Sequence, residues 1–335
     1  PHERVAEITP FQMGTMPVLV GSVLCNLHDC TRETLKSLGE DPSENGGGYF
    51  LYKDPYVTGC TENMAFNKMM TATPQRQDKK YVQTEIISQR GGAFDNSSQV
   101  RVAYNINGSI TLELNSTKFE NARLPVLIMY ALFGMTDREA VETIVFDVGS
   151  DDPITRRILG VLSQSLYKSD QYFKPLLFET NRERLVQKTA ERFAKYLTNP
   201  SAYADNEQAI RYLNTDLLNT LDRVFLPHMG IGPNDRVRKL RFLGLMVYKT
   251  FLVHFGILPS VNRDCLDNKR AHSPGESIGK ILKTVINNNG IGPAIRSIQQ
   301  LLRTEPWPNI TAGAVVSRFR NTMSRTDFDR VMRQM

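Results

Sequence analysis

The stretch VRVAYNINGSITLEL, residues 100–114, decides the fold. Apolar side chains alternate with polar ones up to Asn107-Gly108, and they alternate again beyond it at Ile110, Leu112 and Leu114. A period of two is typical of strands that bury one face, and an Asn-Gly pair between two such runs is typical of a type I′ hairpin turn. The stretch therefore predicts a β-hairpin with one face against a hydrophobic core.

Further β structure is predicted on the N-terminal side of this hairpin. Met16–Val23 and Tyr49–Tyr52 are short apolar runs that favour strands, and Lys80–Ser88 continues the same character. The three glycines of residues 46–48 predict a tight backbone turn. A phosphate-binding loop would also need a Lys-Ser or Lys-Thr pair that opens a helix, and a strand pattern follows instead.

Helices are predicted on the C-terminal side, because the hydrophobic period changes to about 3.6 after Leu124-Pro125. A polar segment, residues 258–271, then marks a boundary before one more helix at about 275–287. Two capping boxes, Thr136 with Glu139 and Thr180 with Glu183, predict helix starts between these points. Pro153 suits the first turn of a helix. Residues 209–225 and 237–255 have helical hydrophobic patterns. Strands followed by helices indicate an α+β fold.

The size and composition of the chain exclude several classes of protein. With 335 residues, of which 41% are hydrophobic and 23% charged, the chain can bury a core, and its length predicts two domains. The longest apolar stretch, Leu240–Leu258, is interrupted by Arg241, Lys249 and His254, so it predicts a buried helix and not a membrane span. Four scattered cysteines favour a reducing compartment, and no secretory signal follows Pro1.

Positive charge is concentrated in the last third of the chain. From Gly232 onward there are 17 Lys and Arg against 7 Asp and Glu, a net charge of +10 within a whole-chain charge of +6. Clustered cations attract polyanions because binding releases counterions from the phosphates, so nucleic acid is the natural partner. The alternative is a solvated basic surface that balances acidic neighbours in a larger assembly.

Two patterns that could carry metal or nucleophilic chemistry are read as structural. Residues 25–30 place Cys25, His28 and Cys30 close together, but a structural zinc site needs four ligands and no second clustered pair exists. His228 and His254 have no nucleophile motif as a sequence partner, so both are interpreted as packing histidines.

The densest group of charges lies between residues 263 and 270. Asp264 and Asp267 could hold a divalent ion, but Arg263, Lys269 and Arg270 compete for them, so ion pairing is the simpler interpretation. The loop keeps a net positive charge, and its mixture of Arg, Lys and Asp donors and acceptors suits an unpaired or distorted strand. The alternative is a domain-joining loop that salt bridges hold in place.

Several motifs resemble, in order and at similar spacing, the second-largest (β-like) subunit of multisubunit DNA-dependent RNA polymerases. The resemblance covers nearly the whole chain, which would be a portion of a full subunit, and is greater to the archaeal, eukaryotic and large-DNA-virus forms than to the bacterial ones. The segments that carry it are Met16–Ser22, Gly47–Phe50, Phe225–His228, Asp264 with Lys269-Arg270, and Ser273–Gly275.

The resemblance implies a domain organisation. Residues 1–60 and 258–335 would form part of a mixed α/β protrusion domain, and residues 61–257 would form a lobe domain, a hairpin sheet followed by helices, inserted into it. The piece would line the DNA cleft and position nucleic acid during transcription, as a component of a nucleotidyltransferase. It would be inactive alone, since the catalytic aspartates of the family lie in the largest subunit. The alternative is a scaffold surface that binds other subunits or transcription factors with little direct contact to nucleic acid.

The resemblance also implies partners, cofactors and a location. Partners would be the template and non-template DNA strands, a nearby RNA–DNA hybrid, the largest and other polymerase subunits, and transcription factors on the lobe, with no membrane. No cofactor is expected in this piece, whereas the whole enzyme would use magnesium and would bind zinc elsewhere in the subunit. The location would be intracellular, cytoplasmic for a viral or archaeal enzyme and nuclear for a cellular eukaryotic one. The residues expected to contact nucleic acid are Arg263, Asp264, Lys269, Arg270 and His272.

Overall fold

The computed structural model describes residues 17–40, 46–52, 56–58, 61–73, 82–91, 97–115, 123–168, 217–304 and 311–324, together with residues 184, 186 and 189. The chain divides into two compact units: unit 1 comprises Pro1–Asn63 and Ala271–Met335, and unit 2 comprises Met64–Arg270. The chain crosses between the units within two short strands, β3 (Thr61–Met64) and β9 (Lys269–His272), which pair with each other.

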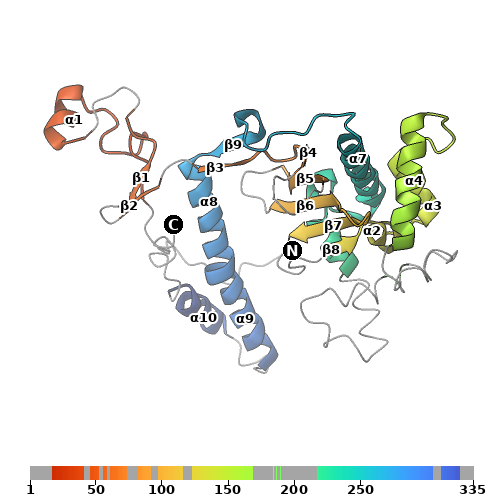
Figure 1. The fold of residues 1–335 in the computed structure, drawn as a ribbon. Helices are drawn as coiled ribbons and strands as arrows, with labels where there is room; N and C mark the ends of the chain where they lie inside the picture. Colours follow the sequence, from red (N-terminus) through yellow and green to blue (C-terminus); the bar gives the residue numbers. More distant parts are fainter. Residues whose placement is uncertain are drawn as a thin grey trace. The chain divides into compact units, whose positions relative to one another are not determined.

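Unit 2 is built on a five-stranded antiparallel sheet in the order β4-β5-β6-β7-β8 (Figure 1). Consecutive strands are neighbours throughout, because each connection between them is short. The central pairing, β5 with β6, runs from Val82↔Tyr104 to Gln89↔Ser97. The strands are β4 (Met70–Ala72), β5 (Val82–Gln89), β6 (Ser97–Tyr104), β7 (Ile110–Asn115) and β8 (Arg123–Pro125).

The predicted hairpin is confirmed as β6 and β7, with Tyr104 opposite Ile110, but its predicted turn type is wrong. A type I′ turn needs positive φ at both Asn107 and Gly108, and only Gly108 has it, at 80°. The Gly108 amide donates to the Asn105 carbonyl at 2.9 Å, and the Asn105 amide donates to the Ser109 carbonyl at 2.9 Å. This is a three-residue loop that ends in a left-handed glycine, and Asn107 instead accepts bonds from the Ser109 amide and hydroxyl at 3.0 and 2.6 Å.

Helices follow the sheet as the sequence predicts. The capping box at Thr136 and Glu139 is confirmed, since each side chain accepts a hydrogen bond from the other residue's backbone amide. Pro153 begins a helix, whereas the box at Thr180 and Glu183 lies outside the described residues. The helices are α2 (Leu127–Leu132), α3 (Asp137–Val145), α4 (Pro153–Lys168) and α7 (Arg236–His254); residues 217–224 are also helical.

Helix α7 packs on the sheet through β5 and β6 and also contacts α3 (Figure 1). The α3 contact requires Gly244, because a Cβ atom there would lie 2.6 Å from the Thr143 carbonyl oxygen. One continuous hydrophobic core joins the sheet to these helices through side chains such as Ile86, Val102 and Leu243. No helix in the described part of the chain is long and apolar enough to cross a membrane.

Unit 1 has a smaller core, in which Phe50 and Ile278 are buried and Leu19, Ile281 and Leu282 pack around them. The strand expected at Met16–Val23 is wrong: among residues 17–23 only Leu19 makes a bridge, to Phe50, and turns follow. Val23 is 80% exposed, so its apolar character does not reflect burial in a strand. The elements are α1 (Arg32–Leu38), β1 (Phe50–Tyr52), β2 (Tyr56–Thr58), α8 (Pro274–Thr284), the π-helical segment η7 (Val285–Ile291), α9 (Gly292–Thr304) and α10 (Ala312–Ser324).

The helix expected to end near Asn287 continues without a break. The polar run after Val285 widens into the π-helical segment η7 and leads directly into α9, which packs against α10. The Arg318 guanidinium donates to the Ser297 hydroxyl at 3.1 Å across that contact. Packing of the next two helices therefore outweighs the weak helix preference of the asparagines at this position.

Candidate nucleic-acid interface

The segment after α7, residues 258–270, is fixed to the edge of the sheet. The Val261 amide donates to the Thr71 carbonyl at 2.8 Å, and the Thr73 amide donates to the Ser260 hydroxyl at 3.1 Å. Thr71 lies in β4, and Thr73 directly follows it. This strand is at one edge of the sheet. The segment thus covers an edge that would otherwise present unpaired backbone groups.

Asn268 organises the charged loop. It is 7% exposed, and its side-chain amide donates to the Asn262 carbonyl at 2.6 Å. Its backbone carbonyl accepts the Ala65 amide at 3.0 Å, so the loop is joined to the start of unit 2. A short 3-10 helix, η6 (Leu266–Asn268), lies between these contacts. The charged side chains of residues 263–270 therefore project from a loop with a defined backbone.

Arg263 is directed into the sheet and not outward. Its Nε lies 2.6 Å from Glu85 Oε1, and the other oxygen of the same carboxylate lies 3.0 Å from Arg101 Nε. Glu85 is 1% exposed on β5, whereas the two arginine side chains are 41% and 35% exposed. A buried carboxylate needs such compensation, so Arg263 neutralises Glu85 and its charge is largely unavailable to a ligand.

Lys269 and Arg270, the adjacent cations of the sequence motif, lie on β9. Successive side chains of a strand point to opposite faces, so these two cations do not form one flat patch. The Arg270 guanidinium carbon lies 5.3 Å from the centroid of the Phe66 ring, a cation–π distance. Both side chains are partly exposed, and the exposed Lys68 ammonium lies nearby, where it donates to the Asp267 carbonyl at 2.8 Å.

The remaining two predicted residues have different environments. Asp264 is exposed, and its amide donates to the Asn262 side chain at 3.0 Å. His272 is only 4% exposed, and its Nδ1 lies 2.8 Å from Glu276 Oε2 on α8. His272 belongs to unit 1, whereas Arg263, Asp264 and Arg270 belong to unit 2. The geometry of His272 is that of a residue that fixes the start of α8.

Sequence reasoning missed the groups that decide what this loop can do. Glu85, Phe66 and Lys68 are far from the loop in sequence, and only the sheet brings them to it. Glu85 carried one available signal, because it is a charged residue inside an otherwise uncharged strand, VQTEIISQ. A charge at such a position indicates either an exposed face or a buried partner, and the sequence does not say which.

The two histidines expected to pack do so. His228, in the 3-10 helix η4 (Pro227–Met229), lies edge-on to Phe242 with the ring centroids 4.9 Å apart. Its Nδ1 is 2.7 Å from the Ser88 hydroxyl. The pKa of His228 is lowered, mainly by burial and also by the positive charge of the nearby Lys239. Ser88 is fully buried, whereas His228 is partly buried. His254 packs against Tyr104, with ring centroids 4.6 Å apart.

The described residues do not fit a metal centre. They contain no group of three His, Cys, Asp or Glu side chains that could hold an ion. In the segment with two cysteines, His28 Nδ1 lies 3.1 Å from the Gly21 carbonyl oxygen, and Cys30 Sγ lies 3.6 Å from the Asn26 carbonyl oxygen. These side chains bond to backbone groups of their own turn.

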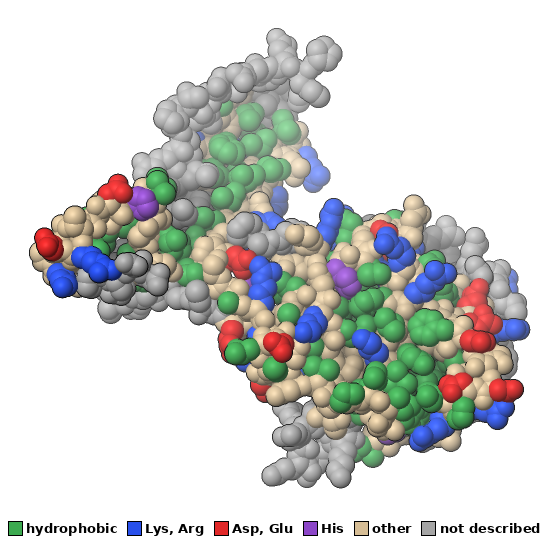
Figure 2. Space-filling model, turned by 90° about the horizontal axis from the view of Figure 1, so that it is seen from above, with side chains coloured by type: hydrophobic (Ala, Val, Ile, Leu, Met, Phe, Trp, Pro, Cys, Tyr) green, Lys and Arg blue, Asp and Glu red, His purple; other side chains and the backbone are tan. Residues whose placement is uncertain are grey.

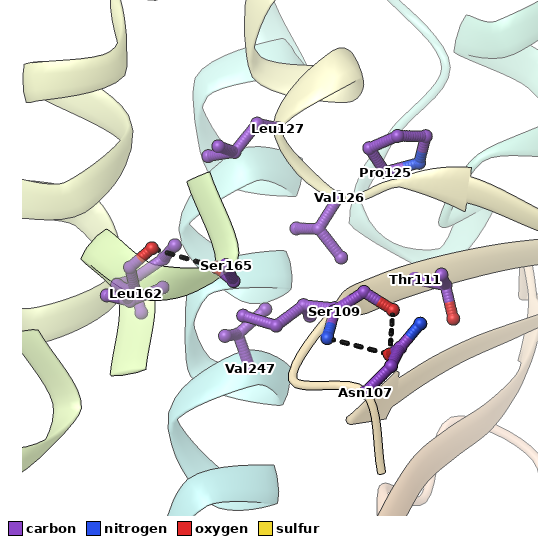
Figure 3. Close-up of a pocket in the computed structure, with 11 residues that line it drawn as sticks. Asn107, Ser109, Thr111, Pro125, Val126, Leu127, Leu162, Ser165 and Val247 are labelled. Carbon is purple, nitrogen blue, oxygen red and sulfur yellow. Dashed lines mark hydrogen bonds between the residues drawn. The ribbon is translucent and has the colours of Figure 1, made fainter. Parts of the chain in front are cut away.

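A cavity of about 250 Å³ lies between the hairpin loop, α4 and α7 (Figure 3). Its wall is mostly apolar, with Val126, Leu162 and Val247 facing the space. The polar wall groups are bonded within the protein: the Ser165 hydroxyl donates to the Leu162 carbonyl at 2.8 Å, and the Ser109 hydroxyl donates to Asn107. None of the lining residues titrates, so the cavity offers no acid or base for catalysis.

Comparison with known proteins finds similarity to one family. A family described as RNA polymerase Rpb2, domain 2, matches residues 117–272, a range that includes Arg263, Lys269 and Arg270. DNA-directed RNA polymerase subunit Rpo2N of Methanothermobacter thermautotrophicus (strain Winter) is 24% identical over 284 residues, which are 84% of this chain and 53% of that subunit.

Second subunits of other organisms give similar matches. Subunit Rpo2 of Sulfolobus acidocaldarius is 26% identical over 281 residues, 82% of this chain and 22% of that subunit. DNA-directed RNA polymerase II subunit 2 of Arabidopsis thaliana is 22% identical over 292 residues, 84% of this chain and 23% of that subunit. The chain spans about half the length of the archaeal Rpo2N subunits that it matches. The resemblance that the sequence motifs indicate is therefore confirmed: the chain is similar, over most of its length, to archaeal and eukaryotic second-largest subunits of multisubunit DNA-directed RNA polymerases.

Proposed function

We propose that this chain lines the DNA cleft of an RNA polymerase and positions nucleic acid during transcription. Unit 2 would be the lobe and unit 1 part of the protrusion, and the other polymerase subunits would be its partners inside the cell. The role would be positional, since the described residues hold neither a metal cluster nor a reactive side-chain pair open to substrate. Bond formation would take place on the largest subunit.

The observation that carries this proposal is the cationic loop within the matched range. Lys269 and Arg270 are partly exposed on β9, and Lys68 is exposed beside the same loop. Cations held on a rigid strand position a phosphate backbone without reading its sequence. Arg263 and His272 would act as positioning residues, because Glu85 and Glu276 engage their side chains.

The test is a salt titration. The 335-residue chain is titrated by fluorescence anisotropy against a labelled single-stranded oligonucleotide and a forked duplex at several KCl concentrations. We expect a steep loss of affinity with salt. In the double variant Lys269→Ala with Arg270→Ala, the slope of log K against log salt should become shallower by about 1.4 on the single strand, that is, by about 0.7 for each lost phosphate contact. The control is Arg138→Ala, which removes an exposed arginine from an acidic region of the same unit.

Two results would contradict the proposal. One is DNA binding that is absent or independent of salt while another polymerase subunit binds tightly, which would favour a scaffold role. The other is an equal effect of the Arg138 control and the β9 double variant, which would show that only net charge matters.

A further inference from the structure

An open groove of about 530 Å³ lies along α3 and the turn that follows it, remote in sequence from the cationic loop. It is lined by four residues of α3, Asp137, Arg138, Val141 and Glu142, and by Val148-Gly149 in the turn. Val148 is 43% exposed and the adjacent Phe146 is 59% exposed. We call these residues, with Phe146 and Asp147, the α3 groove.

Phe146 is held in an unfavourable backbone conformation. Its φ is 66° and its ψ is −39°, and the Asp147 amide donates to the Val145 carbonyl at 2.8 Å, so Phe146 is the central residue of a γ-turn with positive φ. This turn form is rare and strained for a residue with a large side chain. A glycine at position 146 would relieve the strain, yet the residue is a phenylalanine whose side chain is mostly exposed.

A ring contact orients the Phe146 side chain. Phe146 and Tyr248 of α7 form a T-shaped pair, with ring centroids 5.6 Å apart and an interplanar angle of 81°. More than half of the Phe146 side chain remains exposed to solvent beside this contact. The protein thus presents an exposed aromatic side chain directly after α3 and two positions before Val148 in the chain.

The segment of chain that contains the groove is acidic. Residues 136–152 contain six Asp or Glu residues and one base, Arg138, a net charge of −5. Arg138 is itself paired with Glu142, the Nε lying 3.0 Å from Oε1. At the right-hand edge of Figure 2, over the region of α3 and α4, acidic side chains lie next to hydrophobic ones, with basic side chains between them. Such a surface repels nucleic acid and attracts cations.

Asp137 adds a carboxylate that lacks compensation from the described residues. Its Oδ2 is buried and accepts no hydrogen bond from them, and burial raises the pKa of the carboxyl. A cation supplied from outside would offset this loss of hydration. The groove therefore combines apolar side chains with an excess of carboxylates, and an exposed aromatic side chain adjoins it in the chain.

We propose that the α3 groove binds a basic peptide segment of another polypeptide, in which at least one arginine lies next to an aliphatic side chain. A guanidinium group can pair with carboxylates and stack on an aromatic face at the same time, whereas a lysine ammonium forms only point contacts. The aliphatic neighbour would contact Val141 and Val148. This surface is separate from the proposed DNA contact and does not depend on it.

The probe is a labelled twelve-residue peptide of alternating Arg and Leu pairs, titrated against the 335-residue chain by fluorescence anisotropy. Two further peptides serve as comparisons. Replacing every Arg by Glu tests the requirement for positive charge, and replacing every Arg by Lys tests the requirement for stacking. We expect binding of the Arg peptide, weaker binding of the Lys peptide and no binding of the Glu peptide.

Two variants test the two components of the groove. Phe146→Gly removes the ring and relieves the strained φ, so it should weaken Arg-peptide binding about tenfold while the midpoint of urea unfolding stays the same or rises. Asp137→Asn combined with Asp147→Asn should weaken binding about tenfold and reduce its salt dependence. Matched controls are Ile106→Ala, an apolar residue that is 69% exposed on the hairpin loop, and Glu33→Gln, an exposed carboxylate on α1.

Different binding results support and contradict the proposed peptide site. Loss of affinity in both groove variants, with both controls equal to the wild type, supports the proposal. No binding of the Arg peptide at about 1 mM, equal binding of the Glu peptide, or equal effects of groove and control variants would overturn it. Binding of a single-stranded oligonucleotide that Phe146→Gly abolishes would also overturn it, since the partner would then be nucleic acid.

Discussion

The hydroxyl oxygens of Thr84 and Thr250 lie 2.7 Å apart in the buried contact between β5 and α7. Thr84 also bonds to Thr71 on β4 at 2.9 Å, and the Thr250 hydroxyl donates to the Met246 carbonyl of its own helix at 2.8 Å. A chain of hydroxyl bonds therefore links two strands to the helix that covers them. Because such groups cannot find water inside the core, each must keep its partner.

Thr84→Val should destabilise unit 2. The substitution preserves shape but leaves the Thr71 and Thr250 hydroxyls without their shared partner, and we expect a loss of about 1–3 kcal/mol in the free energy of unfolding. Urea denaturation followed by circular dichroism measures the change. Thr84→Ser keeps the hydroxyl and is the control; a Val variant as stable as the Ser variant would show that the bonds contribute little.

The α+β character of unit 2 was predictable because its signals are local. Alternation around Asn107-Gly108 identifies β6 and β7, and the capping box at Thr136 and Glu139 identifies the start of α3. These patterns depend on residues a few positions apart, so sequence alone contains them. The turn type was not predictable, because Asn107 uses its side chain to bond Ser109 in place of a left-handed backbone.

The candidate site was predictable only in part, because its decisive contacts are not local. The run at residues 263–270 indicates a charged loop, but Glu85, which neutralises Arg263, is 178 positions earlier in the chain. The burial of His272 against Glu276 depends on the start of α8, and the π-helical continuation after Val285 depends on packing with α9 and α10. Such effects are tertiary and leave no signal in a short window.

Protonation of His228 should destabilise the protein. The His228 backbone amide donates to the Ser88 oxygen at 3.2 Å, so the Ser88 hydroxyl proton is available to be donated to His228 Nδ1. An Nδ1 that accepts this hydrogen bond carries no proton, which is the state of a neutral ring. The pKa of His228 is lowered in the folded state, so the unfolded chain binds more protons at mildly acidic pH. The free energy of unfolding should therefore fall as pH drops through about 6.5, the pKa of the unfolded histidine.

Urea midpoints measured between about pH 5 and pH 8 test this prediction. His228→Asn offers a side-chain oxygen to Ser88 but does not titrate, so it should lose less stability over that range than the wild type. His254→Gln is the companion variant, because the pKa of His254 is lowered as well, by burial and by Arg157. Equal acid sensitivity of the wild type and His228→Asn would contradict the assignment to His228.

The cavity beside the hairpin loop should accept an added methylene group. Val247 is fully buried in α7 and faces this space (Figure 3), so Val247→Ile should raise the free energy of unfolding by up to about 0.8 kcal/mol. Leu162→Ala enlarges the same cavity and should lower it by about 2–5 kcal/mol. Urea denaturation of both variants decides the point, and a clear loss of stability in Val247→Ile would show that the space is not available.

Glu85 links the stability of unit 2 to its proposed contact with DNA. Glu85→Gln removes the carboxylate shared by Arg101 and Arg263 while keeping a similar shape. Because both arginines are more than a third exposed and can recover hydration, we expect a modest loss of about 1–2 kcal/mol in the free energy of unfolding, less than for a fully buried pair. The charge of Arg263 would then become available on the cationic loop.

The same substitution should strengthen DNA binding. Releasing one cation adds about one phosphate contact, so the slope of log K against log salt should steepen by about 0.7 on single-stranded DNA. Glu85→Gln combined with Arg263→Gln supplies the control, since it removes both the carboxylate and the released cation and should restore the wild-type slope. A variant that loses stability but leaves the slope unchanged would show that Arg263 cannot reach nucleic acid even when Glu85 no longer holds it, and its role would then be confined to anchoring the loop on the sheet.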